Sequence, residues 1–153
     1  MNSTPLTDPI LAAARVAALT HEGFSTVDAS ASAVRCTAKR SLAPAYFELQ
    51  LRGSEYWVRM LTADRWLSES VEGDVLEGDP IDELLEEELA ELGWRGKVGE
   101  LKHFRDEQKV YVYEHKVPAV SAKPLVETAA LFLVAYARTF EQLGDMQSGA
   151  SAD

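Results

Sequence analysis

The dipeptide Gly53-Ser54 constrains the fold of this chain more than any other local feature. It separates two alternating segments, Tyr46–Arg52 and Glu55–Leu61, and a glycine in the first position of a two-residue loop is typical of a type II′ β-hairpin. The register of such a hairpin gathers Phe47, Leu49, Leu51, Tyr56, Val58 and Met60 on one face and pairs Arg52 with Glu55, Gln50 with Trp57 and Glu48 with Arg59 on the other. A slip by one residue would destroy both faces, so the turn and the side chains predict the same antiparallel pairing.

Periodicity along the rest of the chain predicts the remaining elements. Helical spacing of apolar residues predicts helices over about residues 8–22, 81–92 and 122–143, with Asp8, Asp79 and Ser121 as expected N-caps. Alternation predicts strands at 33–39 and 65–71 and a second hairpin, 97–105 with 108–117, around a turn at Asp106-Glu107, while the small polar stretch 25–32 is expected to be a connection. The order α-βββ-α-ββ-α predicts an α+β fold with one antiparallel sheet packed by helices.

Length and composition indicate one domain without covalent or membrane support. We expect residues 1–144 to form a single domain and the small, polar residues 145–153 to be a disordered tail. Cys36 is the only cysteine, so no intrachain disulfide forms, and the N-terminus lacks a signal-peptide pattern. The longest uncharged apolar stretch, 128–137, is far shorter than the roughly 20 residues of a membrane span. We therefore expect a cytoplasmic protein that has no membrane as a partner.

One segment carries the whole charge excess of the chain. The net charge is -10, and eleven acids without a base lie between Arg65 and Arg95. Such a segment repels phosphate, which argues against a nucleic-acid partner. It is either a solvated surface that keeps the protein in solution or a patch that holds a basic partner.

The search for catalytic groupings is negative. The sequence has no glycine-rich phosphate loop, no nucleophile elbow and no zinc-protease motif. Its histidines are His21, His103 and His115, and the expected hairpin places His103 opposite Val110 and His115 near Val98, so they do not form a pair. Cys36 alternates with Arg35 in a strand and is expected to be a buried apolar residue. We predict no enzyme activity, no metal site and no cofactor.

Trp57 is the most informative candidate for binding. In the predicted register it shares the polar face of the hairpin with Gln50, Glu48 and Arg59. A tryptophan on such a face either packs beneath another element or anchors a partner. The candidate partner surface is therefore Trp57, Arg59, Gln50, Glu48 and, on the next expected strand, Trp66.

The last helix is apolar nearly all round between Ala129 and Ala137. A helix on an open sheet needs only one apolar stripe, so two of its faces need cover. The cover comes either from the first helix and the sheet together or from a second chain.

Several stretches resemble, in order and hydrophobic pattern, the type III secretion chaperone-like fold and, within it, the YbjN-type domain. They are Tyr46–Arg52, Ile81–Leu92, and Val110–Tyr113 followed by Leu125–Leu143. The resemblance implies a small, acidic, non-enzymatic bacterial protein, often a homodimer, that binds another polypeptide. In secretion chaperones the middle helix commonly forms the dimer seam, which corresponds here to Ile81, Leu84, Leu85 and Leu89. The competing seam is the last helix, with Phe132 and Tyr136.

Two main hypotheses on function follow, beside a weaker third, an enzyme whose site is assembled from scattered residues and would show a deep polar pocket around His103 or His115. The first is a non-enzymatic protein-binding module, chaperone-like or regulatory, that holds a segment of a partner polypeptide. The second is an acidic inhibitor or immunity-type protein that blocks a basic surface through residues 69–91, and that binding would weaken strongly with salt.

Overall fold

The hairpin around Gly53-Ser54 forms in the predicted register. In the computed structural model, β3 (Tyr46–Arg52) pairs antiparallel with β4 (Glu55–Thr62), and Glu48 lies opposite Arg59. Gly53 has a φ of 62°, in the left-handed region that favours glycine, and Ser54 does not share it, as a type II′ turn requires. The structure describes residues 8–41, 43–77 and 80–143; the expected tail at 145–153 and the expected cap Asp79 lie outside these ranges.

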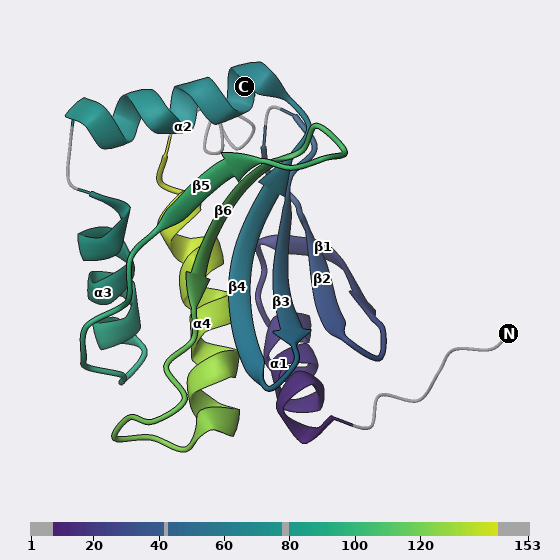
Figure 1. Cartoon of the computed structure of the whole chain (residues 1–153), viewed down its shortest axis with the longest axis vertical. Coiled ribbons are helices and arrows are strands. Elements are labelled where there is room, and N and C mark those ends of the chain that lie inside the picture. The colour runs from purple at the N-terminus through teal and green to yellow at the C-terminus, as the bar shows by residue number, and fades with distance from the viewer. Residues whose placement is uncertain (1–7, 42, 78–79, 144–153) are drawn as a thin grey trace, which may run out of the picture.

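The hairpin is the centre of a six-stranded sheet. Over the described residues the strand order is β1-β2-β3-β4-β6-β5, and every neighbouring pair is antiparallel (Figure 1). The flanking strands are β1 (Phe24–Ala29), β2 (Ala33–Ala38), β5 (Lys102–Arg105) and β6 (Tyr111–Lys116). The predicted α+β class, with one antiparallel sheet packed by helices, is confirmed.

The described helices are α1 (Pro9–Leu19), α2 (Arg65–Glu77), α3 (Ile81–Glu91) and α4 (Leu125–Phe140). α1 and α4 pack on each other and on strands β1 to β4, α3 packs on α4, and α2 crosses the end of the sheet near β4 (Figure 1). Asp8 begins α1 as predicted, because its Oδ1 accepts the backbone N–H groups of Ile10 and Leu11 at 2.8 and 3.0 Å. Within the described ranges, none of the helices has the length and apolar character needed to cross a bilayer.

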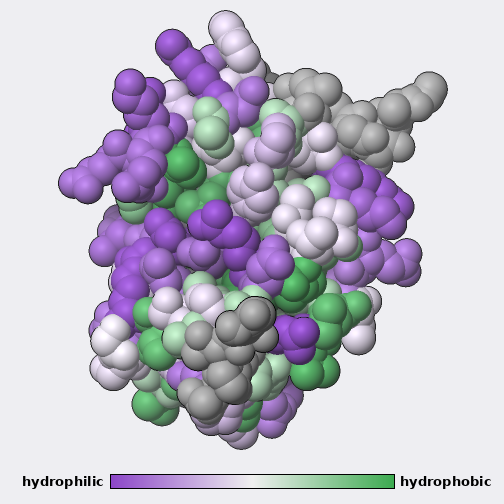
Figure 2. Space-filling model, turned by 90° about the vertical axis from the view of Figure 1, so that its right-hand side faces the viewer, coloured by the Kyte–Doolittle hydropathy of each residue, from purple (hydrophilic) through white to green (hydrophobic). Residues whose placement is uncertain are grey.

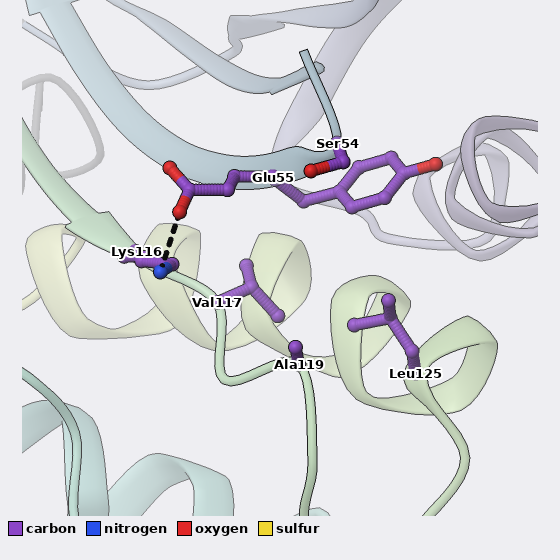
Figure 3. A pocket seen from close by; sticks show the side chains of 7 residues that line it. Ser54, Glu55, Lys116, Val117, Ala119 and Leu125 are labelled. Atoms are coloured by element: carbon purple, nitrogen blue, oxygen red, sulfur yellow. Dashed lines mark ion pairs between the residues drawn. The ribbon is translucent and has the colours of Figure 1, made fainter. Parts of the chain in front are cut away.

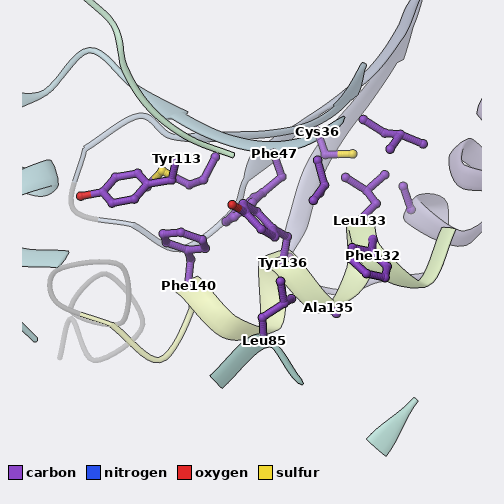
Figure 4. Close-up of a cluster of buried hydrophobic side chains, with 14 of the residues drawn as sticks. Cys36, Phe47, Leu85, Tyr113, Phe132, Leu133, Ala135, Tyr136 and Phe140 are labelled. Carbon is purple, nitrogen blue, oxygen red and sulfur yellow. The ribbon is translucent and has the colours of Figure 1, made fainter. Parts of the chain in front are cut away.

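The surplus apolar surface of α4 is covered within one chain. Tyr136 and Phe140 lie between α4 and the sheet, close to Phe47 and Tyr113, while Leu85 of α3 lies on another side of α4 (Figure 4). The ring centres of Tyr113 and Phe140 are 5.2 Å apart in an edge-to-face contact. The sheet, α1 and α3 together therefore surround α4.

The residues predicted to form a dimer seam are interior, so that prediction is wrong for these side chains. Ile81, Leu85, Leu89, Phe132 and Tyr136 are at most 1% exposed in the single chain, and the half-buried Leu84 packs against the same core. They hold one chain together and are not available to a second copy. A homodimer stays a prediction and would have to use another surface.

Residues 65–71 form the first half of helix α2 rather than the predicted strand. Leu67 and Val71 alternate as in a strand, but they also lie four residues apart, which places both on one face of a helix, and both are buried. The Oδ1 atom of Asp64 accepts the backbone N–H of Leu67 at 2.8 Å and so caps the first turn. A short alternating segment fits both periods, and here the cap favours the helix.

The stretch 25–32 was expected to be a connection, but most of it belongs to β1. This edge strand pairs only with β2, and Phe24 is its one buried residue. Because an edge strand that is exposed on most positions needs few apolar residues, the sequence carries no clear alternation there.

The second hairpin forms with a longer loop than predicted. Asp106–Val110 separates β5 from β6, and Lys109 takes a φ of 66°. His103 therefore lies opposite Tyr113 rather than Val110. His115 lies opposite Val58 of β4 rather than near Val98.

Candidate functional site

The face of the sheet that the described helices leave uncovered, here named the outer face, carries a row of alternating charges. The register places one charged residue of each strand directly opposite the next, in the order Asp28, Arg35, Glu48, Arg59, Glu114 and Lys102. Opposite charges at such positions attract each other. The sequence alone gave only the Glu48–Arg59 pair, because the other pairs depend on the order of strands that are distant along the chain.

Two buried carboxylates organise this row. Glu48 is 5% exposed, and it accepts hydrogen bonds from Nε of Arg35 and from Nη1 of Arg59, both at 3.1 Å. Glu114 is 2% exposed and accepts from Nε of Arg59 at 3.0 Å, while Arg52 binds both of its oxygens. Burying a carboxylate is costly unless it is paired and hydrogen-bonded, and the three arginines supply both kinds of contact on this face.

Trp57 packs beneath basic side chains on the outer face. It lies opposite Gln50, as predicted, and is 9% exposed. The guanidinium of Arg52 and the ammonium of Lys102 lie 4.7 and 4.9 Å from the centre of its indole. This geometry is that of cation–π contacts. Of the two roles that the sequence left open for Trp57, the structure assigns packing.

Trp66 lies apart from the other predicted binding residues. It is at the start of α2, beyond the end of β4, and is 72% exposed, whereas Trp57 is near the start of β4. Its inclusion assumed the strand at 65–71, which is a helix. The structure thus brings Trp57, Arg59, Gln50 and Glu48 onto one face and leaves Trp66 outside it.

A hollow of about 360 Å³ opens on the outer face, and we name it the outer hollow. Its lining includes Arg35, Tyr46, Glu48, Gln50 and Arg59 from the strands and Asp106 and Gln108 from the β5–β6 loop. The guanidinium carbon of Arg35 lies 5.4 Å from the centre of the Tyr46 ring. Sequence reasoning missed Arg35 and the loop residues. The Arg35–Glu48 pair needed the β2–β3 register, and the loop was expected to be a tight turn.

A smaller hollow of about 180 Å³ lies where the β3–β4 turn meets the segment after β6. Ser54 and Glu55 border it on one side and Ala119 and Leu125 on the other, with the Glu55–Lys116 ion pair of 2.7 Å at its edge (Figure 3). Its size and its single exposed ion pair make it the weaker candidate.

Exposed apolar side chains are scattered over the surface. They are Val16 and Leu19 of α1, Trp66 of α2, Phe104 of β5 and Val120. On the side of the molecule that carries β1 and β2, hydrophilic and hydrophobic side chains are interspersed (Figure 2). A binding surface is therefore better sought on the outer face than in an apolar patch.

The buried His115 forms a hydrogen-bonded chain with Tyr136, which is also buried, and with Asp82, whose side chain is partly exposed. Its Nδ1 lies 2.8 Å from the Tyr136 hydroxyl, and its Nε2 lies 2.5 Å from Oδ1 of Asp82. Burial lowers the pKa of His115 and raises the pKa of Tyr136. The Tyr136 hydroxyl therefore donates to Nδ1, and Nε2–H donates to Asp82. With both ring nitrogens occupied and the ring fully buried, this chain ties β6 to α3 and α4 rather than offering a base to a substrate.

The other two histidines also pair with carboxylates. His103 stacks on Tyr113 with ring centres 3.8 Å apart and contacts Glu72 of α2, and His21 lies 3.0 Å from Glu141. Over the part of the chain that the structure describes, no three His, Cys, Asp or Glu side chains converge as a metal site would require.

Many acidic side chains of the segment 69–91 already contact a basic side chain of the same protein. The contacts are Glu69 with Arg65, Glu72 with His103, Asp82 with His115, Glu86 with Lys97, and Glu88 and Glu91 with Arg138. Glu83 and Glu87 are exposed on α3. The charge excess is thus partly compensated by bases from other parts of the fold.

Comparisons with known proteins find no matching family model, no similar curated protein and no similar solved structure. The resemblance to YbjN-type domains and to secretion chaperones therefore stays a prediction.

Proposed function

We propose that this protein is a non-enzymatic, chaperone-like binding module that holds a flexible segment of another polypeptide on the outer face of its sheet. The observation that carries the proposal is the outer hollow, which lies on the helix-free face and is lined by three of the predicted binding residues, Glu48, Gln50 and Arg59. At about 360 Å³ it lies within the size range of ligand sites.

The arginine–glutamate network supports this proposal because it is preorganised. Arg35, Arg59 and Glu48 are held by their mutual hydrogen bonds before any partner arrives. Side chains that are already fixed lose little conformational entropy on binding, which leaves more of the contact energy for affinity.

The state of the titratable groups supports a non-enzymatic role. Both oxygens of Glu48 and of Glu114 are bound to arginines, and both nitrogens of His115 are bound within the core. A general acid or base must contact the substrate, whereas these atoms already contact other side chains of the protein. The free, buried Cys36 fits a reducing compartment, and we propose the cytoplasm as the site of action.

The alternative, an acidic inhibitor acting through residues 69–91, draws less support from the geometry. Glu88 and Glu91 already bind the guanidinium of Arg138, and Glu86 contacts Lys97. A basic partner would have to displace these bases or use the acids that remain exposed.

The test of the binding proposal is a peptide selection on the intact chain. A library of random decapeptides with blocked ends is selected against the immobilised protein, and the binders are mapped by NMR on the labelled chain. We expect shifts of Arg35, Tyr46 and Gln50 on the outer face. Failure to select any peptide, or binders that map to another surface, would overturn the proposal.

A matched pair of variants tests the location independently. Ala63 lines the outer hollow and is exposed, and Ala119 lines the smaller hollow and is also exposed. Ala63→Trp places an indole at the outer hollow and should weaken the selected peptides by about tenfold or more, whereas Ala119→Trp should leave their affinity unchanged. Equal effects of the two substitutions would contradict the assigned site.

A further inference from the structure

Guanidinium N–H groups beside the outer hollow lack an acceptor among the residues that the structure describes. Arg35 uses Nε for Glu48, and its Nη1 and Nη2 have no acceptor among the residues that the structure describes. Arg59 uses Nε and Nη1, and its Nη2 is without an acceptor over the same residues. The guanidinium donors that remain beside the hollow are thus unmatched by the described residues.

Several acceptors around the hollow are already engaged. One oxygen of Glu48 accepts a hydrogen bond from Arg35 and the other from Arg59. Oε1 of Gln50 accepts from Nε of Arg52 at 2.5 Å. The Oδ1 atom of Asp106 accepts the backbone N–H groups of Gln108 and Val110 at 2.9 and 3.0 Å and so shapes the loop. A ligand that supplies acceptors can bind the remaining guanidinium N–H groups of Arg35 and Arg59, whereas one that supplies donors finds the oxygens of Glu48 and Gln50 already bonded.

We infer that the outer hollow selects a carboxylate side chain, aspartate or glutamate, on the segment that it holds. This inference rests on the function proposed above and names the chemistry of the partner. A carboxylate matches the planar fork of a guanidinium, and such charge-assisted hydrogen bonds are the strong ones. Neither Lys nor Arg on the partner would satisfy the unmatched donors of Arg35 and Arg59.

The overall acidity of the protein does not oppose this assignment. The acid-rich segment lies on α2 and α3, which contact the opposite face of the sheet through Ser68–Tyr113 and Asp82–His115. Screening at physiological ionic strength, where the Debye length is about 8 Å, weakens the effect of those exposed charges on the other face. The one carboxylate on the lining that no base neutralises is Asp106, whose Oδ1 binds only backbone N–H groups.

Substitutions of Arg35 and of Asp106 are therefore expected to change the affinity for the peptide in opposite directions. Arg35→Gln removes donors and should weaken the selected decapeptides by about tenfold, and Arg35→Lys, which keeps the charge but loses the fork, should weaken them less. Asp106→Asn keeps the acceptor that shapes the loop but removes the negative charge that repels the carboxylate of the peptide. It should therefore strengthen binding by about two- to fivefold. Arg15→Gln, at an exposed position of α1, is the control and should change nothing.

The peptides supply the second arm. We expect the selected sequences to be enriched in Asp and Glu, and replacing the enriched acid by its amide should weaken binding by about tenfold. If peptides bind the outer face and are blocked by Ala63→Trp but tolerate the amide, the inference fails and the binding proposal stands. If no peptide is selected, the binding proposal itself fails. A parallel library with free C-termini supplies a further control. If it yields binders without acidic side chains, the hollow binds the C-terminal carboxylate of the peptide and the inference is wrong.

Discussion

The Nδ1 atom of His115 lies 2.8 Å from the hydroxyl of Tyr136, and both side chains are fully buried where β6 meets α4. On the other side of the ring, Asp82 accepts from Nε2, and Glu86 is the next acidic group to act on it. A neutral imidazole suits this position because it offers one acceptor to the hydroxyl and one donor to the carboxylate.

This arrangement predicts a protein that loses stability in mild acid. Burial lowers the pKa of His115 from its ordinary 6.5 more than Asp82 and Glu86 raise it. As the pH falls through 6.5 the unfolded chain takes up a proton that the folded chain refuses, so the free energy of unfolding falls. Urea unfolding at about pH 7.5 and about pH 5.5 measures the difference. In His115→Asn the dependence on pH should shrink, and an equal dependence in both proteins would contradict the assignment.

Glu48→Gln should destabilise the fold by about 1.5–3 kcal/mol, because it weakens two charge-assisted hydrogen bonds and leaves Arg59 short of one partner. The measurement is the midpoint and slope of urea unfolding. Glu69→Gln is the control, since Glu69 and Arg65 form an exposed pair on α2, and its midpoint should stay near that of the wild type. If the two variants behave alike, the outer-face network does not contribute as described.

Leu85→Ala should cost about 2–5 kcal/mol of stability by opening a cavity between α3 and α4. Because Leu85 is interior in the single chain, the loss should be independent of protein concentration. Leu19→Ala, at a position 57% exposed on α1, should change the free energy of unfolding by less than about 0.5 kcal/mol. A loss for Leu85→Ala that grows on dilution would instead indicate a dimer seam.

Gly53→Ala should destabilise the hairpin by about 1–2 kcal/mol, because an alanine at a φ of 62° meets its own backbone. No atom lies within 4 Å of the added Cβ, so the cost comes from the backbone and not from a clash. Gly99→Ala, which is equally open and has no positive φ, is the matched control. Equal stability of the two variants in thermal unfolding would argue against the type II′ turn.

Cys36 should resist thiol reagents in the folded protein. It is fully buried, and burial, with smaller contributions from Asp28 and Glu48, raises its pKa to about 12. The thiolate that reacts is therefore scarce at neutral pH. Labelling by a chromogenic disulfide should be slow in buffer and fast in urea. Rapid stoichiometric labelling of the folded chain would show that β2 is more open than described.

The sequence carried enough information for the parts of the fold that depend on short-range chemistry. The hairpin register followed from Gly53 and the two charge pairs beside it, and the start of α1 followed from Asp8. The polar face of the hairpin, and with it Glu48, Gln50 and Arg59 of the candidate site, came from the same register. These features depend on residues that are close along the chain, and a side-chain period of two leaves few alternatives.

The features that sequence reasoning missed depend on contacts between distant segments. The alternation of Leu67 and Val71 fits a strand and a helix equally, and only packing against the core distinguishes them. The row through Arg35, Arg59 and Glu114 needed the order of β2, β4 and β6. The outer hollow additionally needed the β5–β6 loop, whose length the sequence did not indicate.

The charged row restricts how the strands can be aligned during folding. The apolar contacts on the helix side repeat every second residue, so they tolerate a strand displaced by two positions. Such a displacement of β4 along β3 would bring Glu48 opposite Trp57 or Leu61 in place of Arg59. A buried carboxylate that loses its partner in this way destabilises the fold by about 3–5 kcal/mol. A sheet in which β3 and β4 are misaligned is therefore less stable than the native one. The ion pairs thus favour the native register over registers displaced by two residues, which the apolar contacts alone would tolerate.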